Sequence, residues 1–463
     1  MNQNLTQGPI VPSLVRLALP IIGMSFVQMA YNMVDMIWLG RVGANAVAAV
    51  GTATFFTWFG ISLLMAMKSG VEITVSQEVG RGDKDKASRY AGNAVLMAVI
   101  LAVVFGVFTF LFSEQLIGFF DLKEMDVNDM AISYLKIIAL GAPFYYTTPT
   151  LGGVFTGAGN SHLPFRMTSA GLLLNIIIDP LFIFGWGPLP ALGSNGAALA
   201  TILAQLFVFG LFSWKILKGE SIIQLTKESF RLTKVIAQKI IRLGVPVAAN
   251  SALFISFSIM IAKIVSSWGA LPIAVQSVGA QIEAISWMTA SGFSTALGAY
   301  TGQNFGANKW YRIYKGFLVT VSISVLVGLM ATLAFLGFGE EIFSMFIPEA
   351  DAIHLGGIYL GILAVSQVFM CMEISTSGAF YGIGKTVPPS LVSIVLTGSR
   401  IPLALLLSGG VMGFEGIGLE GVWWSVSLTS IVKGLLLFGW FYWLIYNRPE
   451  RMEERNAYLA EAT

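Results

Sequence analysis

Two aspartates interrupt long apolar stretches of the sequence. Asp35 stands in QMAYNMVDMIWLGRVG (residues 28–43), and Asp179 stands in LLLNIIIDPLFIFG (residues 172–185). A carboxylate in hydrocarbon costs about 2.5–3.5 kcal/mol even on insertion scales. Two acids that lie close together in such surroundings cannot both stay charged without a proton, a bound cation or a basic partner. The sequence therefore predicts that these acids bind an exchangeable cation.

Polar residues at helical spacing accompany each acid. Asn175 precedes Asp179 by four residues, so the two share a helix face. Around Asp35, polar side chains recur at i, i+3, i+4 and i+7 and form one stripe: Gln28, Tyr31, Asn32 and Asp35. We expect this stripe to face a water-filled cavity or the bundle interior. Tyr31 and Met33 are suited to line a pocket for flat cationic molecules.

The two acids also share a depth with a threonine. Counted from the outer ends of the expected helices at ~1.5 Å per residue, Asp35, Asp179 and Thr201 lie roughly 6–11 Å below the outer surface. We therefore expect one polar cluster of Asp35, Asn175, Asp179 and Thr201. The alternative for the amide and the hydroxyl is that they only bond one helix to another.

Three occupants suit this cluster. A proton is the simplest counter-ion for paired carboxylates. Sodium is suited too, because carboxylate, amide and hydroxyl oxygens are the hard ligands that such cations prefer. An organic cation is the third. If a proton and a cationic compound compete for one charge, exchange transport follows, and protons entering from outside release the compound outward.

The composition indicates that these residues lie in an integral membrane protein. The 463 residues are 56% hydrophobic and 11% charged, with a mean hydropathy of +0.76, whereas soluble domains are about 25% charged. A net charge of +2 gives no sign of nucleic-acid binding. Cys371 cannot form an internal disulfide, and with His162 and His354 it forms no metal or catalytic set. We expect no cleavable signal peptide, because no basic region precedes a short apolar core.

Apolar runs long enough to cross a bilayer recur about twelve times. Each should be helical, because lipid offers backbone groups no other partner. They lie near residues 14–39, 46–67, 88–112, 131–153, 162–185, 194–217, 237–266, 274–296, 312–338, 353–376, 387–408 and 420–446. The expected fold class is therefore all-α integral membrane.

Lysine and arginine predict the orientation. If the N-terminus is cytoplasmic, 21 of the 27 basic residues fall in inner segments. Only Arg41, Lys123 and Lys136 fall in outer segments, and Lys263, Arg400 and Lys433 fall within helices. We therefore expect a multi-pass protein of the bacterial cytoplasmic (inner) membrane with both termini inside.

The chain repeats itself at an offset of about 225–226 residues. VSQEVGRGDKDKASRY (75–90) parallels TGQNFGANKWYRIY (301–314), and GVFTGAGNSHLPF (153–165) parallels GAFYGIGKTVPPS (378–390). This predicts two six-helix lobes, residues 1–217 and 236–447, with a cytoplasmic linker 218–235 and a tail 448–463. Since six is even, the lobes should be related by a pseudo-twofold axis along the membrane normal, with a cavity that opens alternately to each side.

A proline and the second lobe complete the candidate residues. Pro20 removes one hydrogen bond from the first helix, which makes it a candidate hinge that bends when Asp35 is protonated; a static kink is the alternative. Glu283, Glu373 and Arg400 form a possible polar site in the second lobe. There, structural ion pairs of Glu283 or Glu373 with Arg400 or Lys433 are the favoured interpretation.

These motifs together resemble the multidrug and toxic compound extrusion (MATE) family along essentially the full chain. The resemblance rests on LALP…VDMIWLGRVG, VSQEVGRGD, TGQNFGA, GVFTGAGNSHLPF and NIIIDP. It implies a V-shaped, monomeric exporter of organic cations with twelve helices and no cofactor beyond a coupling proton or sodium ion. The pattern is most similar to the DinF-like branch, which implies ion coupling at Asp35, Asn175, Asp179 and Thr201 and drug contacts at Gln28 and Tyr31.

Several alternatives are weighed against proton-coupled efflux. The second lobe lacks the acid in its first helix that NorM-type sodium coupling uses, but sodium in the first lobe stays open. A lipid-linked oligosaccharide flippase should have a basic cavity, and this first lobe offers acids. An enzyme lacks a recognisable catalytic set, and a channel does not fit the two-lobe repeat.

Overall fold

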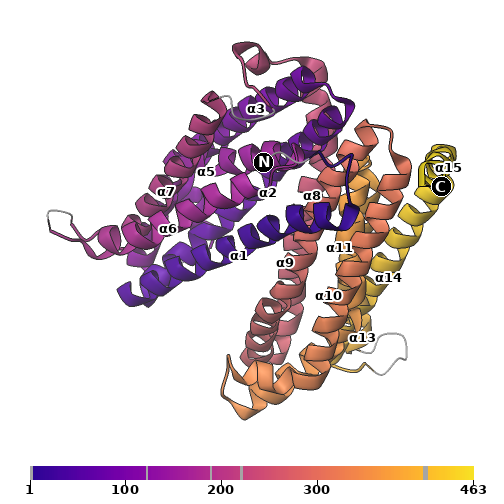
Figure 1. Cartoon of the computed structure of the whole chain (residues 1–463). Helices are drawn as coiled ribbons and strands as arrows, with labels where there is room; N and C mark the ends of the chain where they lie inside the picture. Colours follow the sequence, from indigo (N-terminus) through magenta and orange to yellow (C-terminus); the bar gives the residue numbers. More distant parts are fainter. Residues whose placement is uncertain (1–3, 121–123, 188–189, 219–222, 410–415, 463) are drawn as a thin grey trace. The chain divides into compact units, whose positions relative to one another are not determined.

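Helices make up nearly all of the chain that the computed structural model describes, which is residues 4–120, 124–187, 190–218, 223–409 and 416–462 (Figure 1). Lys123, one of the basic residues expected outside, and part of the expected linker lie outside these ranges. The first half holds α1 (Ile10–Val42), α2 (Ala44–Arg81), α3 (Lys84–Leu111), α4 (Ser113–Gly118), α5 (Met125–Gly157), α6 (His162–Phe184), α7 (Ser194–Leu217) and the 3₁₀ turn η1 (Lys227–Phe230). The second half holds α8 (Lys234–Val265), η2 (Ser266–Trp268), α9 (Ala270–Gly306), α10 (Trp310–Ser344), α11 (Ala350–Gly382), α12 (Val387–Gly398), α13 (Arg400–Gly409), α14 (Leu419–Tyr446) and α15 (Pro449–Ala462).

The long helices match the predicted membrane spans. Within the described residues, ten helical segments are long and apolar enough to cross a membrane, and α12 with α13 counts as one of them. The helices α5 and α9 are similarly long, 33 and 37 residues, and they complete two sets of six. The expectation of a twelve-helix all-α fold is thus confirmed. The protein is a multi-pass membrane protein.

The chain divides into two compact units, and the division does not run at the expected linker. Unit 1 comprises residues 1–4 and 23–248, and unit 2 comprises residues 5–22 and 249–463. The predicted lobes 1–217 and 236–447 differ from these units in two places. The first part of α1 belongs to unit 2, and the first part of α8 belongs to unit 1. The helices α1 and α8 change unit after Ile22 and Ala248, at the same spacing of 226 residues as the sequence repeat.

The ends of helices repeat at the same offset. After α2, Gly82 (φ 81°) closes the helix with its amide bonded to Val79 O, and Asp83 N bonds Glu78 O at 3.0 Å. After α9, Asn308 (φ 58°) does the same: Lys309 N bonds Asn304 O at 2.8 Å. This left-handed C-terminal cap needs glycine or asparagine, because a Cβ is strained at positive φ. The paired caps show that the two halves of the sequence fold alike locally.

Small residues bring α8 against α2 within unit 1. Gly244 lies so close to the backbone of Ala66 that a Cβ at this position would meet the Ala66 carbonyl oxygen. Gly70 faces the backbone of Ile240 in the same way. Close approach through glycines is a common way for membrane helices to gain packing contacts, since lipid gives no hydrophobic drive between them.

In unit 2, the segment before α1 is held by residues near the ends of α9 and α10. Leu5 N donates to Gln303 Oε1 at 3.2 Å, and Asn304 Nδ2 donates to Leu5 O at 3.1 Å. Lys309 Nζ donates to Thr6 O at 2.8 Å. Leu5 is fully buried. Several hydrogen bonds and an apolar anchor therefore fix this segment in place.

Candidate functional site

Three helices of unit 1, α1, α6 and α7, bring the predicted cluster together. Asn175 and Asp179 lie one turn apart on α6 and are fully buried, and Thr201 on α7 is also buried. Asn175 Nδ2 donates to Asp179 Oδ1 at 3.0 Å. Their i, i+4 spacing places both side chains on one face, as expected from the sequence.

Asp35 on α1 meets Asp179 directly. The two carboxyl groups lie within interaction distance of each other. Even so, Asp35 Oδ1 and Asp179 Oδ2 are buried without a hydrogen bond from any residue that the structure describes. An ionised carboxylate only accepts hydrogen bonds, so the two groups can bond to each other only if one of them is protonated. A single proton held between them is the simplest way to satisfy both atoms.

Tyrosines surround this pair of acids. The Tyr31 hydroxyl, one turn before Asp35 on α1, lies beside Thr201. Tyr134 of α5 also lies within electrostatic reach of both Asp35 and Asp179. Tyr31 Oη, Thr201 Oγ1 and Asn175 Oδ1 are buried and unbonded among the described residues. The cluster thus presents several oxygen atoms that can accept a hydrogen bond or contact a cation.

The rest of the predicted polar stripe does not join this cluster. Gln28 and Asn32 are exposed, and Met33 has 55% of its surface exposed. Tyr31 and Asp35 are the stripe residues that turn toward α6 and α7. For Gln28 and Asn32, the expectation that the stripe faces a water-filled cavity stays a prediction, as do the suggested substrate contacts of Gln28, Asn32 and Met33.

No group of three or more His, Cys, Asp or Glu side chains that could hold a metal ion occurs in the part of the chain described. The cluster instead combines two carboxyl groups with neutral oxygens of an amide, a phenol and a hydroxyl. This donor set suits a proton. A weakly bound monovalent cation is also compatible, because it accepts neutral oxygen ligands.

The candidate hinge lies beside the change of unit. Pro20 is inside α1, which continues as one helix through it. The boundary between the units follows at Ile22 and Gly23, and in α8 Pro246 likewise precedes the boundary after Ala248. Each proline removes a backbone hydrogen bond shortly before the helix passes from one unit to the other.

The acids and bases of unit 2 form separate networks. Lys433 Nζ lies 3.0 Å from Glu373 Oε2, and Ser393 also donates to Glu373 at 3.0 Å. This confirms one expected ion pair. Arg400 instead donates to Thr429 Oγ1 at 3.0 Å and Ser430 Oγ at 2.9 Å, so of the two expected basic partners it is Lys433 that pairs with a carboxylate.

Glu283, the third member of the possible second-lobe site, has neutral partners. Tyr359 Oη donates to Glu283 Oε1 at 2.8 Å, and Gln367 Nε2 donates to Oε2 at 3.3 Å. Ser286 donates to Gln367 Oε1 at 2.8 Å and holds the amide in this orientation. The acid on α9 is thus oriented by α11 rather than by an arginine or a lysine.

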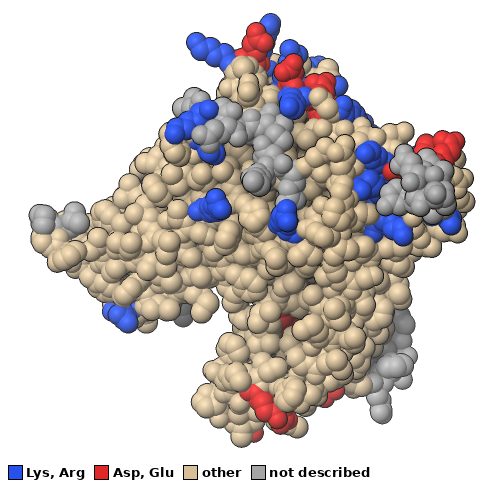
Figure 2. Space-filling model, in the orientation of Figure 1, with Lys and Arg blue, Asp and Glu red and all other residues tan. Residues whose placement is uncertain are grey.

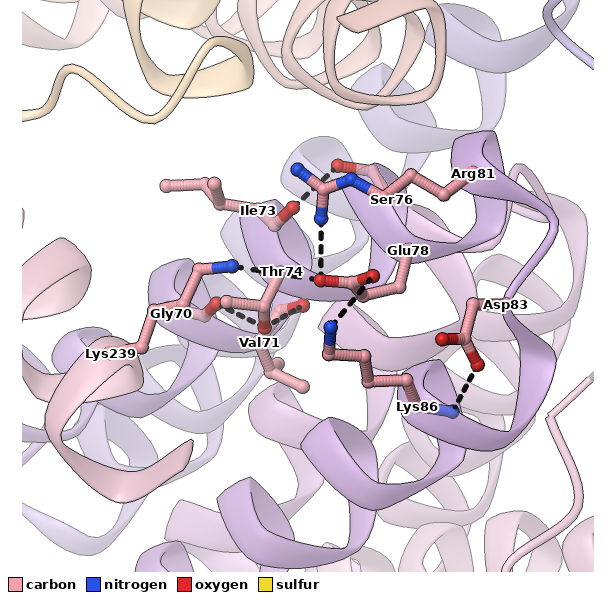
Figure 3. A network of polar contacts seen from close by, with 10 residues as sticks. All are labelled: Gly70, Val71, Ile73, Thr74, Ser76, Glu78, Arg81, Asp83, Lys86 and Lys239. Atoms are coloured by element: carbon pink, nitrogen blue, oxygen red, sulfur yellow. Dashed lines mark hydrogen bonds and ion pairs between the residues drawn. The ribbon is translucent and has the colours of Figure 1, made fainter. Parts of the chain in front are cut away.

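Sequence reasoning missed Glu78 near the end of α2 (Figure 3). Its side chain is buried, and its carboxylate forms ion pairs with three basic side chains: Arg81 at 2.6 Å, Lys239 at 3.6 Å and Lys86 at 4.0 Å. Lys239 comes from α8, so the carboxylate ties the start of α8 to α2 within unit 1. The motif VSQEVGRGD contains this acid, but as a sequence pattern it indicates only the repeat and the family resemblance. In the second copy the equivalent position is Asn304, which holds Leu5 instead.

The family model for MatE matches two segments of the chain, residues 20–181 and 246–406. The chain belongs to the MatE family. The two matched segments begin at Pro20 and Pro246 and confirm the internal repeat. This MatE protein is also similar to curated relatives along nearly its whole length. It is 28% identical to the probable multidrug resistance protein NorM of Thermotoga maritima over 91% of this chain and 90% of the relative.

Other relatives widen the range of named substrates. The chain is 25% identical to the probable multidrug resistance protein NorM of Deinococcus radiodurans, over 93% of the chain and 94% of the relative. It is 20% identical to a FAD transporter of Shewanella oneidensis, over 94% and 95%. Membership of the DinF-like branch remains a prediction.

Solved structures support the same fold. A multidrug resistance MATE family transporter of the MOP superfamily in an outward-facing conformation superposes with a TM-score of 0.85 at 24% identity, over 96% of this chain and 97% of that one. A MATE protein in the bent conformation gives 0.85 at 23% identity, over 99% and 98%. The two-lobe MATE fold is therefore the fold of this chain.

Proposed function

We propose that this MatE protein exports small organic, mostly cationic compounds across the membrane in exchange for protons, by alternating access. The observation that carries the proposal is the pair Asp35 and Asp179, whose facing carboxyl groups each have a buried oxygen without a donor. The names of the relatives from Thermotoga maritima and Deinococcus radiodurans support the choice of multidrug compounds.

In the proposed cycle, the charge of Asp35 alternates between two counter-ions. Deprotonated, the pair favours a cationic compound nearby. A proton arriving from outside supplies the missing donor between the two carboxyl groups and cancels the charge that held the compound. Protonation then relaxes α1 beyond Pro20, and the compound leaves outward. In this cycle Asn175 and Thr201 orient the acids, and a single chain is sufficient.

Efflux from a defined membrane tests the proposal. Everted vesicles that contain the protein are mixed with a fluorescent organic cation, and uptake of the cation is measured under an imposed proton gradient or sodium gradient that is high inside. We expect the proton gradient to drive it, and Asp35→Asn to abolish it with unchanged protein level. Transport that is insensitive to both gradients, or full activity of Asp35→Asn, would contradict the proposal.

Sodium coupling is the second candidate, and the neutral oxygens of Tyr31, Asn175 and Thr201 favour it. In the same assay, transport driven by sodium alone and abolished by Asp179→Asn would replace the proton by sodium. FAD, a substrate named for the relative from Shewanella oneidensis, serves as an anionic test compound. An acidic cluster disfavours it, so we expect no FAD transport.

A further inference from the structure

A basic pocket in unit 1 plays no part in the proposed transport cycle. It has a volume of about 590 Å³ and lies where the segment between η1 and α8 packs on α3; the residues that line it are Arg89, Glu228, Arg231, Leu232, Thr233 and Lys234. Three cations and one acid leave the pocket with a net positive charge. Figure 2 shows Lys and Arg side chains, with some Asp and Glu among them, gathered at the end of unit 1 where this segment lies, whereas most of the rest of the face in view carries no charge.

The cations of the pocket differ from those beside them. Arg81, Lys86 and Lys239 all lie within 4.0 Å of the buried Glu78. By contrast, Arg89, Arg231 and Lys234 are exposed and form no ion pair within the described part of the chain. Glu228 lines the same pocket but is not within ion-pair distance of any of them. The positive charge of this pocket is therefore available to an anion from outside the protein.

The wall of the pocket is fixed rather than loose. Asn93 of α3 is fully buried, and its amide donates to Ser229 O at 3.0 Å and Arg231 O at 3.1 Å. Thr233 N donates back to Asn93 Oδ1 at 2.9 Å. Gly92 lets the backbone of Ser229 approach so closely that a Cβ would meet it. The Asn93 side chain thus bonds to the backbone at three positions of the segment. Because the backbone that carries the cations is already ordered, less conformational entropy is lost when a ligand binds.

Apolar side chains beside the cations indicate the source of the anion. Phe230, Leu232 and Val235 have 38%, 53% and 72% of their surface exposed. They alternate with Arg231 and Lys234 along the segment that leads from η1 into α8, a candidate membrane span. A free phosphate would use only the cations. A phospholipid would place its phosphate on the cations and its glycerol and upper acyl chains against the apolar side chains, as in basic pockets at the cytoplasmic ends of membrane helices.

We propose that this pocket binds the headgroup phosphate of an anionic phospholipid of the leaflet that faces it. The guanidinium groups of Arg89 and Arg231 suit a phosphate because they present parallel N–H donors. Lys234 adds a point charge from the first turn of α8. The bound lipid would stabilise the segment 231–234 on α3 and thereby the start of α8.

Lipid retention by the full-length protein tests the proposal. The protein is reconstituted in nanodiscs of equal parts phosphatidylcholine and phosphatidylglycerol, released into detergent, and examined by native mass spectrometry. We expect retained phosphatidylglycerol and no retained phosphatidylcholine. The variant Arg89→Gln/Arg231→Gln/Lys234→Gln should lose it. Because each basic residue near a membrane surface contributes about 1 kcal/mol, a single Arg231→Gln should weaken retention roughly fivefold.

A matched control removes the same charge elsewhere. Arg166, Lys385 and Arg455 are exposed basic residues outside the pocket. The variant Arg166→Gln/Lys385→Gln/Arg455→Gln should retain phosphatidylglycerol like the unsubstituted protein. Arg89→Lys/Arg231→Lys keeps the positive charge and should retain more lipid than the glutamine variant, and an unchanged melting temperature of the glutamine variant shows that its loss is not due to misfolding.

Three results would overturn the proposal. Equal retention by the pocket variant and the unsubstituted protein would show that the pocket binds no lipid. Equal loss in the pocket variant and the control would indicate only general attraction of charge. Displacement of phosphatidylglycerol by millimolar inorganic phosphate, with phosphate bound in its place, would show that the site serves a free anion. None of these results depends on whether the protein transports drugs.

Discussion

Asn175 donates a hydrogen bond to Asp179 Oδ1 at 3.0 Å, and both side chains are fully buried one turn apart on α6. The bond leaves Asp179 Oδ2 as the oxygen of this carboxyl group without a donor in the described chain. The amide thus decides which oxygen of Asp179 is available to a shared proton. A neighbour with no ionisable group therefore controls the orientation of an acid.

Replacing this amide should impair transport. Hydrogen bonds to charged groups contribute about 1.5–3 kcal/mol, so Asn175→Ala is expected to lower the efflux rate in everted vesicles about tenfold or more. Asn45→Ala, at an exposed position of α2, is the control and should leave efflux unchanged. Undiminished efflux by Asn175→Ala would mean that the orientation of Asp179 does not matter.

The bend of α1 is expected to depend on Pro20. Spin labels placed on α1 before and after this residue should report a distance that changes between acid and alkaline pH in the unsubstituted protein. In Pro20→Ala the backbone hydrogen bond is restored, which stiffens the helix, so the change should be lost. Pro246→Ala in α8 is the matched control and should keep it. If the unsubstituted protein shows no change with pH, the kink is static.

The close contact of α8 with α2 predicts a stability effect. A Cβ on Gly244 would meet the Ala66 carbonyl, so Gly244→Ala should lower the free energy of unfolding by about 1–3 kcal/mol. Gly210→Ala, in α7 with nothing within 4 Å of the added Cβ, should be neutral or slightly stabilising. Thermal unfolding in one detergent measures both. Similar melting temperatures for the two variants would contradict the close packing.

The ion pair of Glu373 and Lys433 should be costly to break from one side. Their side chains are only 10% and 5% exposed. Glu373→Gln or Lys433→Met alone should therefore destabilise the protein by about 3–5 kcal/mol, and the double variant should recover part of this loss. Glu114→Gln breaks the exposed pair with Lys136 and should cost less than about 1 kcal/mol. Additive losses in the double variant would show that the pair is not coupled.

Much of the fold follows from the sequence because lipid leaves helices as the only choice for apolar runs. The range 162–185 expected for one span nearly coincides with α6 (His162–Phe184). The range 46–67 is far shorter than α2, which continues to Arg81. Apolar length stops at the membrane boundary, whereas this helix continues into a segment whose polar residues are buried by neighbouring helices. The glycine caps, which the sequence does contain, mark the true ends better than hydropathy does.

The site was predictable for a different reason. The depths of Asp35, Asp179 and Thr201 can be estimated from the sequence, because a helix rises by a constant amount per residue and the outer membrane surface is a common reference for all helices. Depth does not predict the ion pair of Glu78, because its partner Lys239 lies on a helix far along the chain and near the end of the span, where many charged residues share the same depth. Periodicity places Gln28, Tyr31, Asn32 and Asp35 on one side of the helix, but it does not show which of them are buried; packing leaves Gln28 and Asn32 exposed.

The division of α1 and α8 between the units has a consequence for the order of synthesis. Leu5 is synthesised before the rest of unit 2, yet its hydrogen-bond acceptor on Gln303 follows 298 residues later. Unit 2 therefore cannot fold from one contiguous stretch of chain. Its first segment, residues 5–22, enters the membrane before α2 to α8 are inserted and packs into unit 2 only afterwards. A protein made as two fragments cut in the linker should consequently assemble only when both fragments are present, because each carries the opening segment of a helix that the other needs.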